Sequence, residues 1–589
     1  MIIEEIEKLL NEAGNKAGYK DNLAVSFSSI PELCDYQCND AFSLAKKYGK
    51  NPFNIAQEIV DNIEKNDFFE FEVVRPAFIN VKLTNKKLGQ VANYCLNDEM
   101  GGVQKHKVSQ RVVLDYGGAN VAKSLHAGHL RSPIIGESLK RLYKFLGDEV
   151  IADVHLGDWG LQMGLTELQL YYDGVLDYYF KNEGVMPSIT LEMLNEAYPK
   201  ASARKDSDEE FKKEADAWTL KIQNKEEPYY EIYKKMREVS VKEIKRQYGE
   251  LGATFDLWLG ESDAEGYIDK AIKIIEDKGL AKISNDALVV EVAQEGENIP
   301  ITNENGEVIR FKNPMPPAML KKYNGASLYA TTDIATILMR NETLGKIDRI
   351  EYITDQRQKM HFTQVFRVCK MAGISPENQQ LLHMSYGTMN GKDGKPFKTR
   401  SGDTVKLDDI INLLIERASE KLKANNVEQS RETALMIGVA AMKFGDLSNS
   451  ISKDYVFDLD RFLSFEGKTG PYLQYTTVRI NSILNKIKES GWEGSNEFLI
   501  SSIEERQIIK SILKLISAYE ICYKEKSLNT LCTAVYELAS NFSTFYNNHN
   551  VINEKDYKVK SSYVLLLKLV RKEIVNALYV LGIEIPKKM

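Results

Sequence analysis

Hydrophobic positions change period near residue 115, and this change marks the central motif of the chain. Arg111–Leu114 is a short apolar run that predicts a buried β-strand. A polar loop with several glycines follows at Gly117–Gly128, and from Leu130 to Leu146 leucine and isoleucine recur at helical spacing. A strand, a glycine-bearing loop and a helix N-terminus are typical of a nucleotide site, because first-turn amides and the helix dipole favour phosphate.

The same periodicities predict a series of elements in the rest of the chain. Near the N-terminus they predict a helix and two half-buried strands, at Ile3–Ala13, Phe68–Val74 and Phe78–Leu83. In the middle they predict a charged helical insertion at about 166–261, a hairpin in which Leu288–Val292 and Val308–Phe311 flank Asn303–Gly306, and two sheet strands at Ala326–Asp333 and Arg349–Thr354. Toward the C-terminus they predict four helices, at Tyr472–Ile487, Glu504–Tyr523, Leu528–Asn548 and Ser561–Leu581.

These elements favour three domains. They are a small α+β domain at residues 1–105, an α/β domain with a parallel sheet at 106–455, and an all-α helical bundle at 456–589. A chain of 589 residues is also too long for one hydrophobic core. In a parallel sheet, ligands bind beyond the carboxyl ends of the strands. Four polar residues lie at or just beyond such predicted ends: Asn120, Tyr329, Asp333 and Gln358.

Composition excludes several classes of protein. The chain is 43% hydrophobic and 27% charged, and no apolar run is long enough for a membrane span. The six cysteines form no C-x-x-C pair, so we expect neither structural zinc nor a disulfide framework, and a reducing cytoplasm fits best. A net charge of −7 argues against indiscriminate nucleic-acid binding, although the stretch 551–589 holds eight Lys/Arg against four Asp/Glu.

Three interpretations compete for the loop at 117–129. Gly117-x4-Ala122-Lys123-Ser124 approaches a P-loop, but an alanine replaces the glycine before the lysine. His126-x2-His129 lacks the spacing and the glutamate of a metalloprotease helix. His126-Ala127-Gly128-His129 fits the H-x-G-H signature of class I aminoacyl-tRNA synthetases. A four-letter motif arises easily by chance, so its context must decide.

That context is a series of segments across nearly the whole chain. They include Asn120–Ser132 (NVAKSLHAGHLRS), His155–Gln162 (HLGDWGLQ), Leu328–Asp333 (LYATTD), Asp355–Phe362 (DQRQKMHF), Gly391–Gly402 (GKDGKPFKTRSG), Leu463–Gly467 (LSFEG) and Pro471–Tyr475 (PYLQY). In this order they closely resemble the arginyl-tRNA synthetases. The resemblance implies a Rossmann-like class I catalytic domain, an N-terminal domain that binds the tRNA elbow, and a C-terminal anticodon-binding bundle.

The resemblance also implies an activation chemistry. The arginine carboxylate attacks the α-phosphorus of ATP and pyrophosphate leaves, so the site must position two anions and stabilise phosphate charge. The implied catalytic residues are Lys123, His126, His129, Lys395 and Lys398, and the implied ATP-binding residues are Ala122, His126, Gly128, His129, Gly387 and Met389. The loop at Lys395–Lys398 lacks the methionine and serines of K-M-S-K-S, and in many arginyl enzymes a lysine before H-x-G-H is thought to compensate. Lys123 holds that place; alternatively it is a solvated loop lysine.

A guanidinium substrate calls for carboxylates that accept paired hydrogen bonds. The implied arginine-binding residues are Asp115, Gly118, Ala119, Asn120, His129, Tyr329, Asp333 and Gln358. Asp115 could instead cap backbone amides. The implied tRNA-binding residues are Asn80, Tyr546, Asn547, Asn548 and His549. Asn80 could equally be a satisfied strand residue, and the cluster at 546–549 could be an ordinary helix end.

The expected function is therefore arginine–tRNA ligation. The expected partners are L-arginine, ATP with Mg²⁺, and tRNA(Arg), with no protein-bound metal and no membrane, and we expect a cytoplasmic monomer. Two rival functions stay open. Small adenylyltransferases share H-x-G-H but lack a C-terminal helical bundle, and a tRNA-binding paralogue could have lost activity, against which His126, His129, Asn120 and Asp333 speak.

Overall fold

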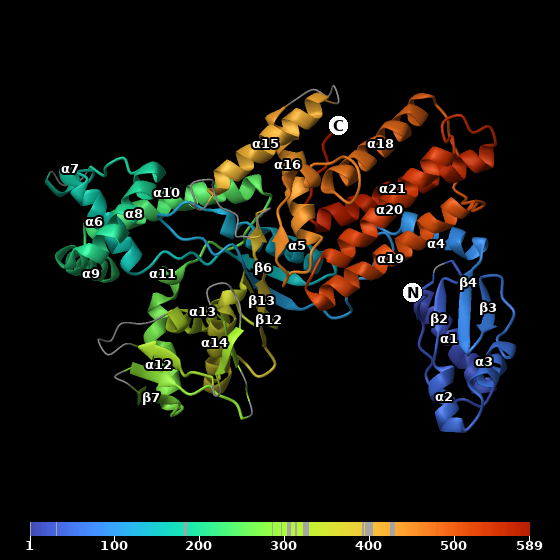
Figure 1. Cartoon of the computed structure of the whole chain (residues 1–589), viewed down its shortest axis with the longest axis horizontal. Coiled ribbons are helices and arrows are strands. Elements are labelled where there is room, and N and C mark those ends of the chain that lie inside the picture. The colour runs from blue at the N-terminus through green and yellow to red at the C-terminus, as the bar shows by residue number, and fades with distance from the viewer. Residues whose placement is uncertain are drawn as a thin grey trace. The chain divides into compact units, whose positions relative to one another are not determined.

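A computed structural model describes most of the chain (Figure 1). The described residues are 2–30, 32–181, 185–284, 287–295, 297, 299–302, 308–312, 315–321, 329–391, 394, 405–424 and 430–589. The chain divides into two compact units. Unit 1 comprises Met1–Val103, Thr476–Ala518 and Ala534–Asn576, and unit 2 comprises Gln104–Tyr475, Tyr519–Thr533 and Ala577–Met589. The predicted domain boundaries differ from this division and stay predictions.

Unit 2 is built on a parallel sheet with the strand order β13-β12-β5-β6. Its strands are β5 (Arg111–Asp115), β6 (Glu149–Asp153), β12 (Arg349–Asp355) and β13 (Gln380–Tyr386), and the crossover helices are α5 (Arg131–Phe145) and α14 (Lys359–Ala372). The strands predicted at 111–114 and 349–354 and the helix predicted from 130 are thereby confirmed. After β5 the chain adds β6 on one side of β5, and later it adds β12 on the opposite side of β5. This switch point, between β5 and β12, is where such sheets bind ligands.

Helices fill the predicted insertion between β6 and the rest of the sheet. They are α6 (Leu161–Tyr172), α7 (Asp177–Lys181), α8 (Leu191–Ser207), α9 (Glu209–Gln223), α10 (Tyr229–Glu250) and α11 (Glu261–Ala264). Next come η2 (Glu265–Tyr267), α12 (Ile268–Asp277), a three-stranded antiparallel sheet of β7 (Ala281–Ser284), β8 (Ala287–Val290) and β11 (Ala318–Lys321), and a hairpin of β9 (Ile299–Thr302) and β10 (Val308–Lys312). Leu257–Gly260 runs beside Asp153–Leu156 through parallel bridges, which returns the chain to the sheet.

Two predictions for the middle of the chain were wrong. Val308–Phe311 pairs with β9 and not with Leu288–Val292, because β9 is the nearer strand across the predicted turn at 303–306, which itself lies outside the described residues. The strand predicted at Ala326–Asp333 is replaced, from Tyr329 on, by helix α13 (Tyr329–Thr343). Buried residues of α13 such as Ile334 and Ile337 pack in a core with α12, α14 and β12, and this tertiary packing overrides a short local pattern.

The C-terminal helices follow their prediction closely. They are α18 (Gly470–Glu489), α19 (Ile503–Glu525), α20 (Asn529–Asn548) and α21 (Tyr557–Val580), preceded in unit 2 by α15 (Leu407–Ala424), α16 (Arg431–Leu447) and α17 (Leu459–Phe462), with the short pair β14 (Met389–Asn390) and β15 (Tyr455–Val456). Unit 1 also contains α1 (Ile2–Lys16), α2 (Ala41–Tyr48), α3 (Pro52–Asp61), α4 (Asn85–Asn97) and an antiparallel sheet in the order β1-β2-β4-β3, from Ser26–Phe27, Tyr36–Cys38, Phe78–Leu83 and Phe69–Val74.

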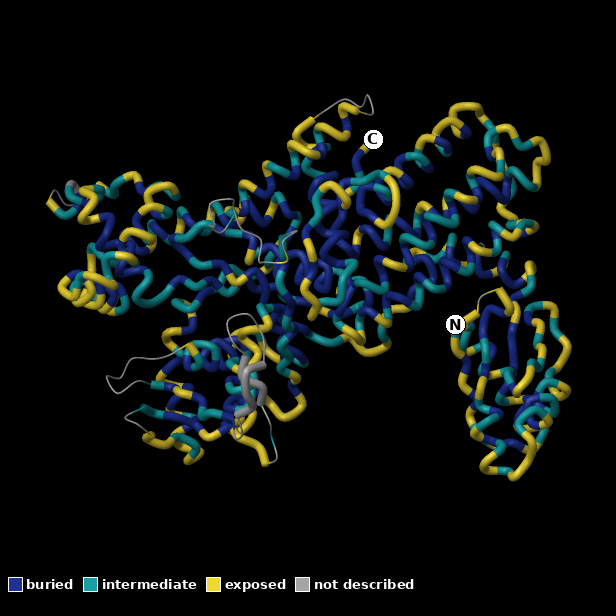
Figure 2. The backbone as a smooth tube through the Cα atoms, in the orientation of Figure 1, coloured by how far each residue is buried: buried dark blue, intermediate teal, exposed yellow. Residues whose placement is uncertain are grey.

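Burial follows these elements. The backbone is mostly buried through the parallel sheet and the helices packed on it, and exposed segments lie mainly in the connections and on outer helix faces (Figure 2). Among the described residues, no helix is both long and apolar enough to cross a membrane.

Candidate active site

The signature loop has its histidine tautomers set by its own backbone. Gly128 N–H donates to His126 Nδ1 at 3.1 Å, and His126 N–H donates to His129 Nδ1 at 3.2 Å. Because each Nδ1 accepts a hydrogen bond, each ring in its neutral form carries its proton on Nε2. The two rings lie 4.0 Å apart between centroids, directly before α5. The loop therefore presents two Nε2–H donors at the start of a helix.

Both histidines are held neutral. Burial and the nearby Lys123 lower the pKa of His126, and burial, His126 and Lys123 lower the pKa of His129 to about 3. Neutral rings can donate hydrogen bonds to a phosphate without adding a positive charge. Gly128 is required beside them, because a Cβ at this position would lie 2.9 Å from His126 Cε1. The loop thus offers two uncharged donors, and its predicted role in binding ATP phosphates stays a prediction.

The segment after the predicted lysine loop contacts the signature. Ala127 N–H donates to Val405 O at 2.9 Å, and Leu407 N–H donates to Leu125 O at 2.9 Å. The predicted catalytic Lys395 and Lys398 lie outside the described residues. Their assignment stays a prediction, but the chain returns from this loop directly against the signature.

Lys123 lies at the same mouth. Its Nζ is 5.8 Å from the ring centroid of Tyr198 on α8, and it is close enough to both signature histidines to lower their pKa. The preceding Ala122 is buried in a left-handed conformation with φ +59°, and its N–H donates to Ser240 Oγ at 3.0 Å. Lys123 is therefore a half-buried cation beside the signature rather than a fully solvated one.

The predicted substrate-binding loop at 118–120 pairs with the segment after β6. Gly157 N–H donates to Ala119 O, and Val121 N–H donates to Gly157 O, both at 2.9 Å. A Cβ on Gly157 would lie 2.2 Å from Asn120 Oδ1, so glycine leaves room for this side chain. Gly118 is exposed with φ +28°, and Ala119 is buried. Asn120 is half-buried at the predicted edge of the sheet.

Asp115 has a partner within the chain. Arg340 of α13 donates from Nη2 to Asp115 Oδ2 at 2.6 Å and to Asp153 Oδ2 at 2.7 Å, and from Nη1 to the Tyr352 hydroxyl at 3.1 Å. Burial raises the pKa of Asp115 even with this guanidinium beside it. Asp115 as a whole is 5% exposed. Asp115 is thus occupied by the chain's own arginine, and its predicted contact with a substrate guanidinium stays a prediction.

Asp333 is the partly exposed carboxylate of the predicted arginine pocket. It lies in the second turn of α13, and its Oδ2 is 2.5 Å from Nε2 of His361. Glu261 at the start of α11 interacts with it: burial, Asp333 and Asp158 raise the pKa of Glu261 to about 8. Tyr329 begins α13 at 76% exposure, and partial desolvation together with the nearby Glu261 and Tyr198 raises the pKa of its hydroxyl. Gln358 is exposed.

Gly387 and Met389, predicted to bind ATP, are buried. Gly387 N–H donates to Ile451 O at 3.1 Å, and Gly387 O accepts from Arg131 Nη1 at 2.6 Å. A Cβ there would lie 2.5 Å from Asp454 Oδ1. Met389 is in β14 and pairs with Tyr455. The structure thus gives Gly387 a packing role, and its contact with ATP stays a prediction.

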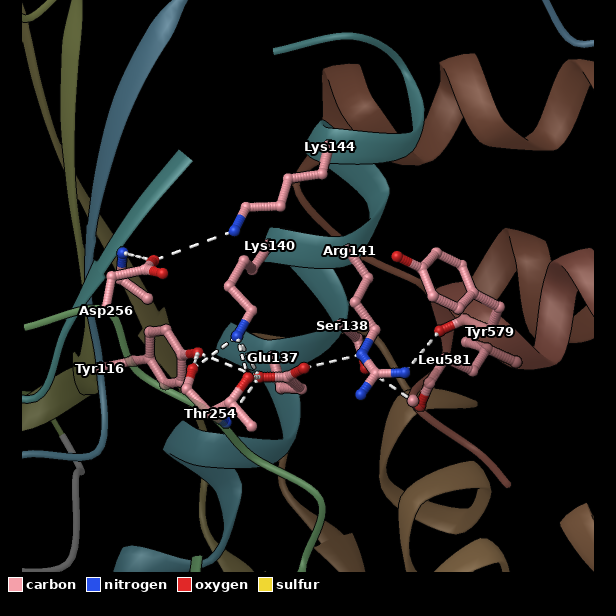
Figure 3. Close-up of polar contacts among 12 residues, drawn as sticks. Tyr116, Glu137, Ser138, Lys140, Arg141, Lys144, Thr254, Asp256, Tyr579 and Leu581 are labelled. Carbon is pink, nitrogen blue, oxygen red and sulfur yellow. Dashed lines mark hydrogen bonds and ion pairs between the residues drawn. The ribbon is translucent and has the colours of Figure 1, made fainter. Parts of the chain in front are cut away.

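Helix α5 is anchored on both sides by a polar cluster (Figure 3). Glu137 accepts from Arg141 Nε at 2.7 Å and from Thr254 N–H at 2.9 Å, and pairs with Lys140 at 2.6 Å. Arg141 Nη1 also donates to Tyr579 O at 3.2 Å. The helix that starts at the signature is therefore fixed both to the end of the insertion and to the last turn of α21.

The predicted tRNA-binding residues have unequal surroundings. Asn80 is 5% exposed in β4, and its Oδ1 accepts from Gln37 Nε2 at 2.8 Å, which favours the satisfied strand residue. Asn548 donates to Glu504 Oε1 at 2.9 Å, and His549 Nδ1 is 2.9 Å from the Tyr563 hydroxyl, which favours a helix end. Asn547 is exposed.

Tyr546 differs from this group. The Arg479 guanidinium of α18 lies 4.1 Å from its ring centroid. An arginine stacked on a half-buried tyrosine offers the planar surface on which unpaired bases stack. Contact of Tyr546 with tRNA stays a prediction.

Three family models together match most of the chain. Residues 90–459 match the catalytic domain of class I tRNA synthetases (R), residues 473–589 the DALR anticodon binding domain, and residues 1–83 the arginyl tRNA synthetase N-terminal domain. A curated arginine–tRNA ligase from Agathobacter rectalis is 40% identical, with 100% of this chain and 99% of the relative covered. One from Alkaliphilus oremlandii is 38% identical, with 100% of both covered.

Solved structures agree on the fold. The arginyl-tRNA synthetase from Plasmodium falciparum has a TM-score of 0.79 at 24% identity, with 100% of this chain and 99% of that chain covered. The one from Thermus thermophilus has a TM-score of 0.75 at 21% identity, with 100% of both covered. The chain therefore belongs to the class I tRNA synthetases. Within that class of enzymes it belongs to the arginyl-tRNA synthetase family, which confirms the resemblance and decides against the P-loop, the metalloprotease helix and the small adenylyltransferases.

Sequence reasoning missed four residues at or near this site: Tyr198, Glu261, Arg340 and His361. His361 was inside a recognised segment, but its partner Asp333 is 28 residues away in the sequence. Glu261 was placed at the end of the charged helical insertion and was given no role in the site. Among the described residues, no cluster of three or more His, Cys, Asp or Glu side chains is arranged to hold a metal ion.

Proposed function

We propose that this chain ligates arginine to tRNA(Arg), and that bound tRNA is needed for the first step. In that step the arginine carboxylate attacks the α-phosphorus of ATP, the bond to the bridging oxygen breaks, and pyrophosphate leaves. In the second step a 3′-terminal hydroxyl of tRNA attacks the arginyl carbonyl and AMP leaves. The observation that carries this proposal is the pair of neutral, Nε2-protonated histidines at the start of α5.

These donors act on the phosphates. His126 and His129 would hold the α- and β-phosphate oxygens in an in-line geometry, and Lys123 would supply the positive charge that the neutral rings lack. Mg²⁺ arrives bound to the ATP phosphates as part of the substrate. Lys395 and Lys398 are proposed to add further positive charge, and Val405, a few residues later in the sequence, contacts the signature.

The amino acid is bound at the other end of the site. Asp333 and Glu261 supply two carboxylates for one guanidinium, and Tyr329 lies near Glu261. Gln358 would help to shape the pocket, and Asn120 would bind the α-amino or carboxyl end. A planar guanidinium satisfies two carboxylates at once, whereas an ammonium cannot span them. We also propose a cytoplasmic monomer. The six cysteines are unpaired and buried, which fits a reducing compartment.

Two assays test the proposal. Aminoacylation of total tRNA with each amino acid in turn should charge tRNA with arginine alone. Arginine-dependent ATP–pyrophosphate exchange should be negligible without tRNA and clear with it, because the incomplete K-M-S-K-S loop needs a partner to close. Full exchange in tRNA-free enzyme would contradict the dependence on tRNA while leaving the ligase activity intact.

A further inference from the structure

His361 contacts the carboxylate on which the proposed arginine pocket depends. Helices α13 and α14 pack against each other in unit 2 (Figure 1). Asp333 lies in the second turn of α13 and His361 in the first turn of α14, where Nε2 donates to Asp333 Oδ2 at 2.5 Å. Within the described part of the chain, this is the side-chain hydrogen bond that Asp333 accepts. Both side chains are partly exposed, at 29% for His361 and 19% for Asp333.

The segment that carries His361 is firmly held. Asp355, at the end of β12, accepts a hydrogen bond from Arg357 N–H at 2.8 Å and thereby caps η3 (Gln356–Gln358) before α14. On its other side the His361 ring packs edge-on against Phe362, with 5.3 Å between centroids. Phe362 in turn stacks on His383 at 4.9 Å. His361 is therefore fixed between the carboxyl edge of the sheet and α13.

A carboxylate has about four lone-pair positions, and a hydrogen bond to one oxygen leaves the others available. The bond from His361 occupies one position on Oδ2 and fixes the rotation of the carboxylate plane. Oδ1 and the remaining position on Oδ2 stay available to a bidentate guanidinium, which tolerates little angular error.

We propose that His361 is a positioning residue that holds Asp333 in the orientation that arginine requires. The proposal rests on the proposed function, in which Asp333 binds the guanidinium. His361 does not touch the substrate. It acts through Asp333, so its loss should weaken arginine binding and leave ATP binding unchanged.

The test uses full-length enzyme and two substitutions at one position. His361→Leu removes the donor, and His361→Gln retains an N–H that can reach the carboxylate. Loss of a hydrogen bond to a charged group typically weakens affinity roughly 10- to 100-fold. His361→Leu should raise the arginine KM and the calorimetric arginine Kd by about that factor, with ATP KM and the melting temperature close to wild type. His361→Gln should recover most of the loss.

A matched control lies two residues further along α14. Thr363 Oγ1 donates to Lys359 O at 2.7 Å and has no bond to Asp333, so Thr363→Ala should keep the wild-type arginine KM. A double-mutant cycle then separates positioning from a general effect on the fold. If His361 acts through Asp333, His361→Leu should add little to the defect of Asp333→Asn.

The outcomes are distinguishable. If Asp333→Asn left the arginine kcat/KM unchanged, Asp333 would not bind the guanidinium, and the proposed function of this pocket would be wrong. A strong defect in Asp333→Asn with normal arginine binding in His361→Leu would overturn only the positioning role. Additive defects, or equal losses for arginine and ATP, would also overturn it, because they would show that His361 acts on the fold and not on Asp333.

Discussion

The guanidinium of Arg340 lies 2.6 Å from Asp115 and 2.7 Å from Asp153, at the carboxyl ends of two adjacent strands. Arg340 is fully buried, and it belongs to the helix that also carries Asp333. The chain's own arginine therefore bridges two buried aspartates at this edge of the sheet. Arg340 lies about two helical turns after Asp333, so it also attaches α13 to the edge of the sheet.

Replacing this arginine should destabilise unit 2. Arg340→Leu leaves two buried carboxylates side by side without a counter-charge, which typically costs about 3–5 kcal/mol. The expected result is a clearly lower melting temperature in differential scanning calorimetry. Adding Asp115→Asn to Arg340→Leu should recover part of the loss by removing one uncompensated charge. An unchanged melting temperature for Arg340→Leu would show that the ion pairs do not hold α13.

The ion pair between Arg340 and Asp115 also shows what the sequence alone could not predict. The strand at Asp115 and the later motif at Tyr329–Asp333 were recognised, because each is a local pattern. The pairing of Asp115 with Arg340 spans 225 residues, and a single charged residue in a helical pattern predicts a solvated face. Likewise, the apolar face of α13 became visible only against β12 and α14. Local periodicity therefore predicted the central strands β5 and β12, helix α5 and the C-terminal helices, while the partners of buried charges required the fold.

Arginine binding should depend on the ionisation of Glu261. Its pKa is raised to about 8, so the side chain is mostly neutral at neutral pH, and a guanidinium favours the ionised form. Affinity should therefore rise with pH and a proton should be released on binding. From about pH 7 to about pH 8.5 the ionised fraction rises roughly eightfold, which sets the expected drop in arginine Kd. Calorimetry across this range gives the measurement.

Glu261→Gln should flatten this profile and bind arginine more weakly at high pH. The pH dependence of ATP KM serves as the internal control, since Glu261 is assigned to the amino acid end. A profile in Glu261→Gln that is as steep as in wild type would assign the titration to another group.

Lys123 should act mainly in the transition state. A positive charge beside the leaving pyrophosphate is used as that charge develops, so its loss should lower kcat more than it raises the arginine KM. Lys123→Ala should slow adenylate formation on the order of 10²- to 10³-fold, measured by exchange in the presence of tRNA, with normal tRNA binding. Lys200→Ala on α8 is the matched control, because Lys200 is exposed and pairs with Asp173 and Glu196. If Lys123→Ala formed the adenylate at nearly the wild-type rate, the alternative interpretation of Lys123 as a solvated loop lysine would be correct.

Asp333 should carry the recognition of the guanidinium, since Asp115 is already bound by Arg340. Asp333→Asn keeps the size of the side chain but removes its charge and places an N–H donor where an acceptor is needed. Removing one partner of a buried charged pair costs roughly 2–5 kcal/mol, which is on the order of 30- to 5,000-fold in arginine kcat/KM. ATP KM should barely change.

The same pocket should discriminate by charge and by shape. Citrulline is close to arginine in shape but neutral, so it cannot satisfy Asp333 and Glu261 and should not be activated. Lysine is charged, but its ammonium cannot span two carboxylates, so it should bind poorly. The measurement is kcat/KM for each amino acid with wild type and Asp333→Asn, with circular dichroism to confirm folding. A folded Asp333→Asn that keeps wild-type arginine kcat/KM would exclude Asp333 from the pocket. Recognition would then have to come from Glu261, or from Asp115 after release of Arg340.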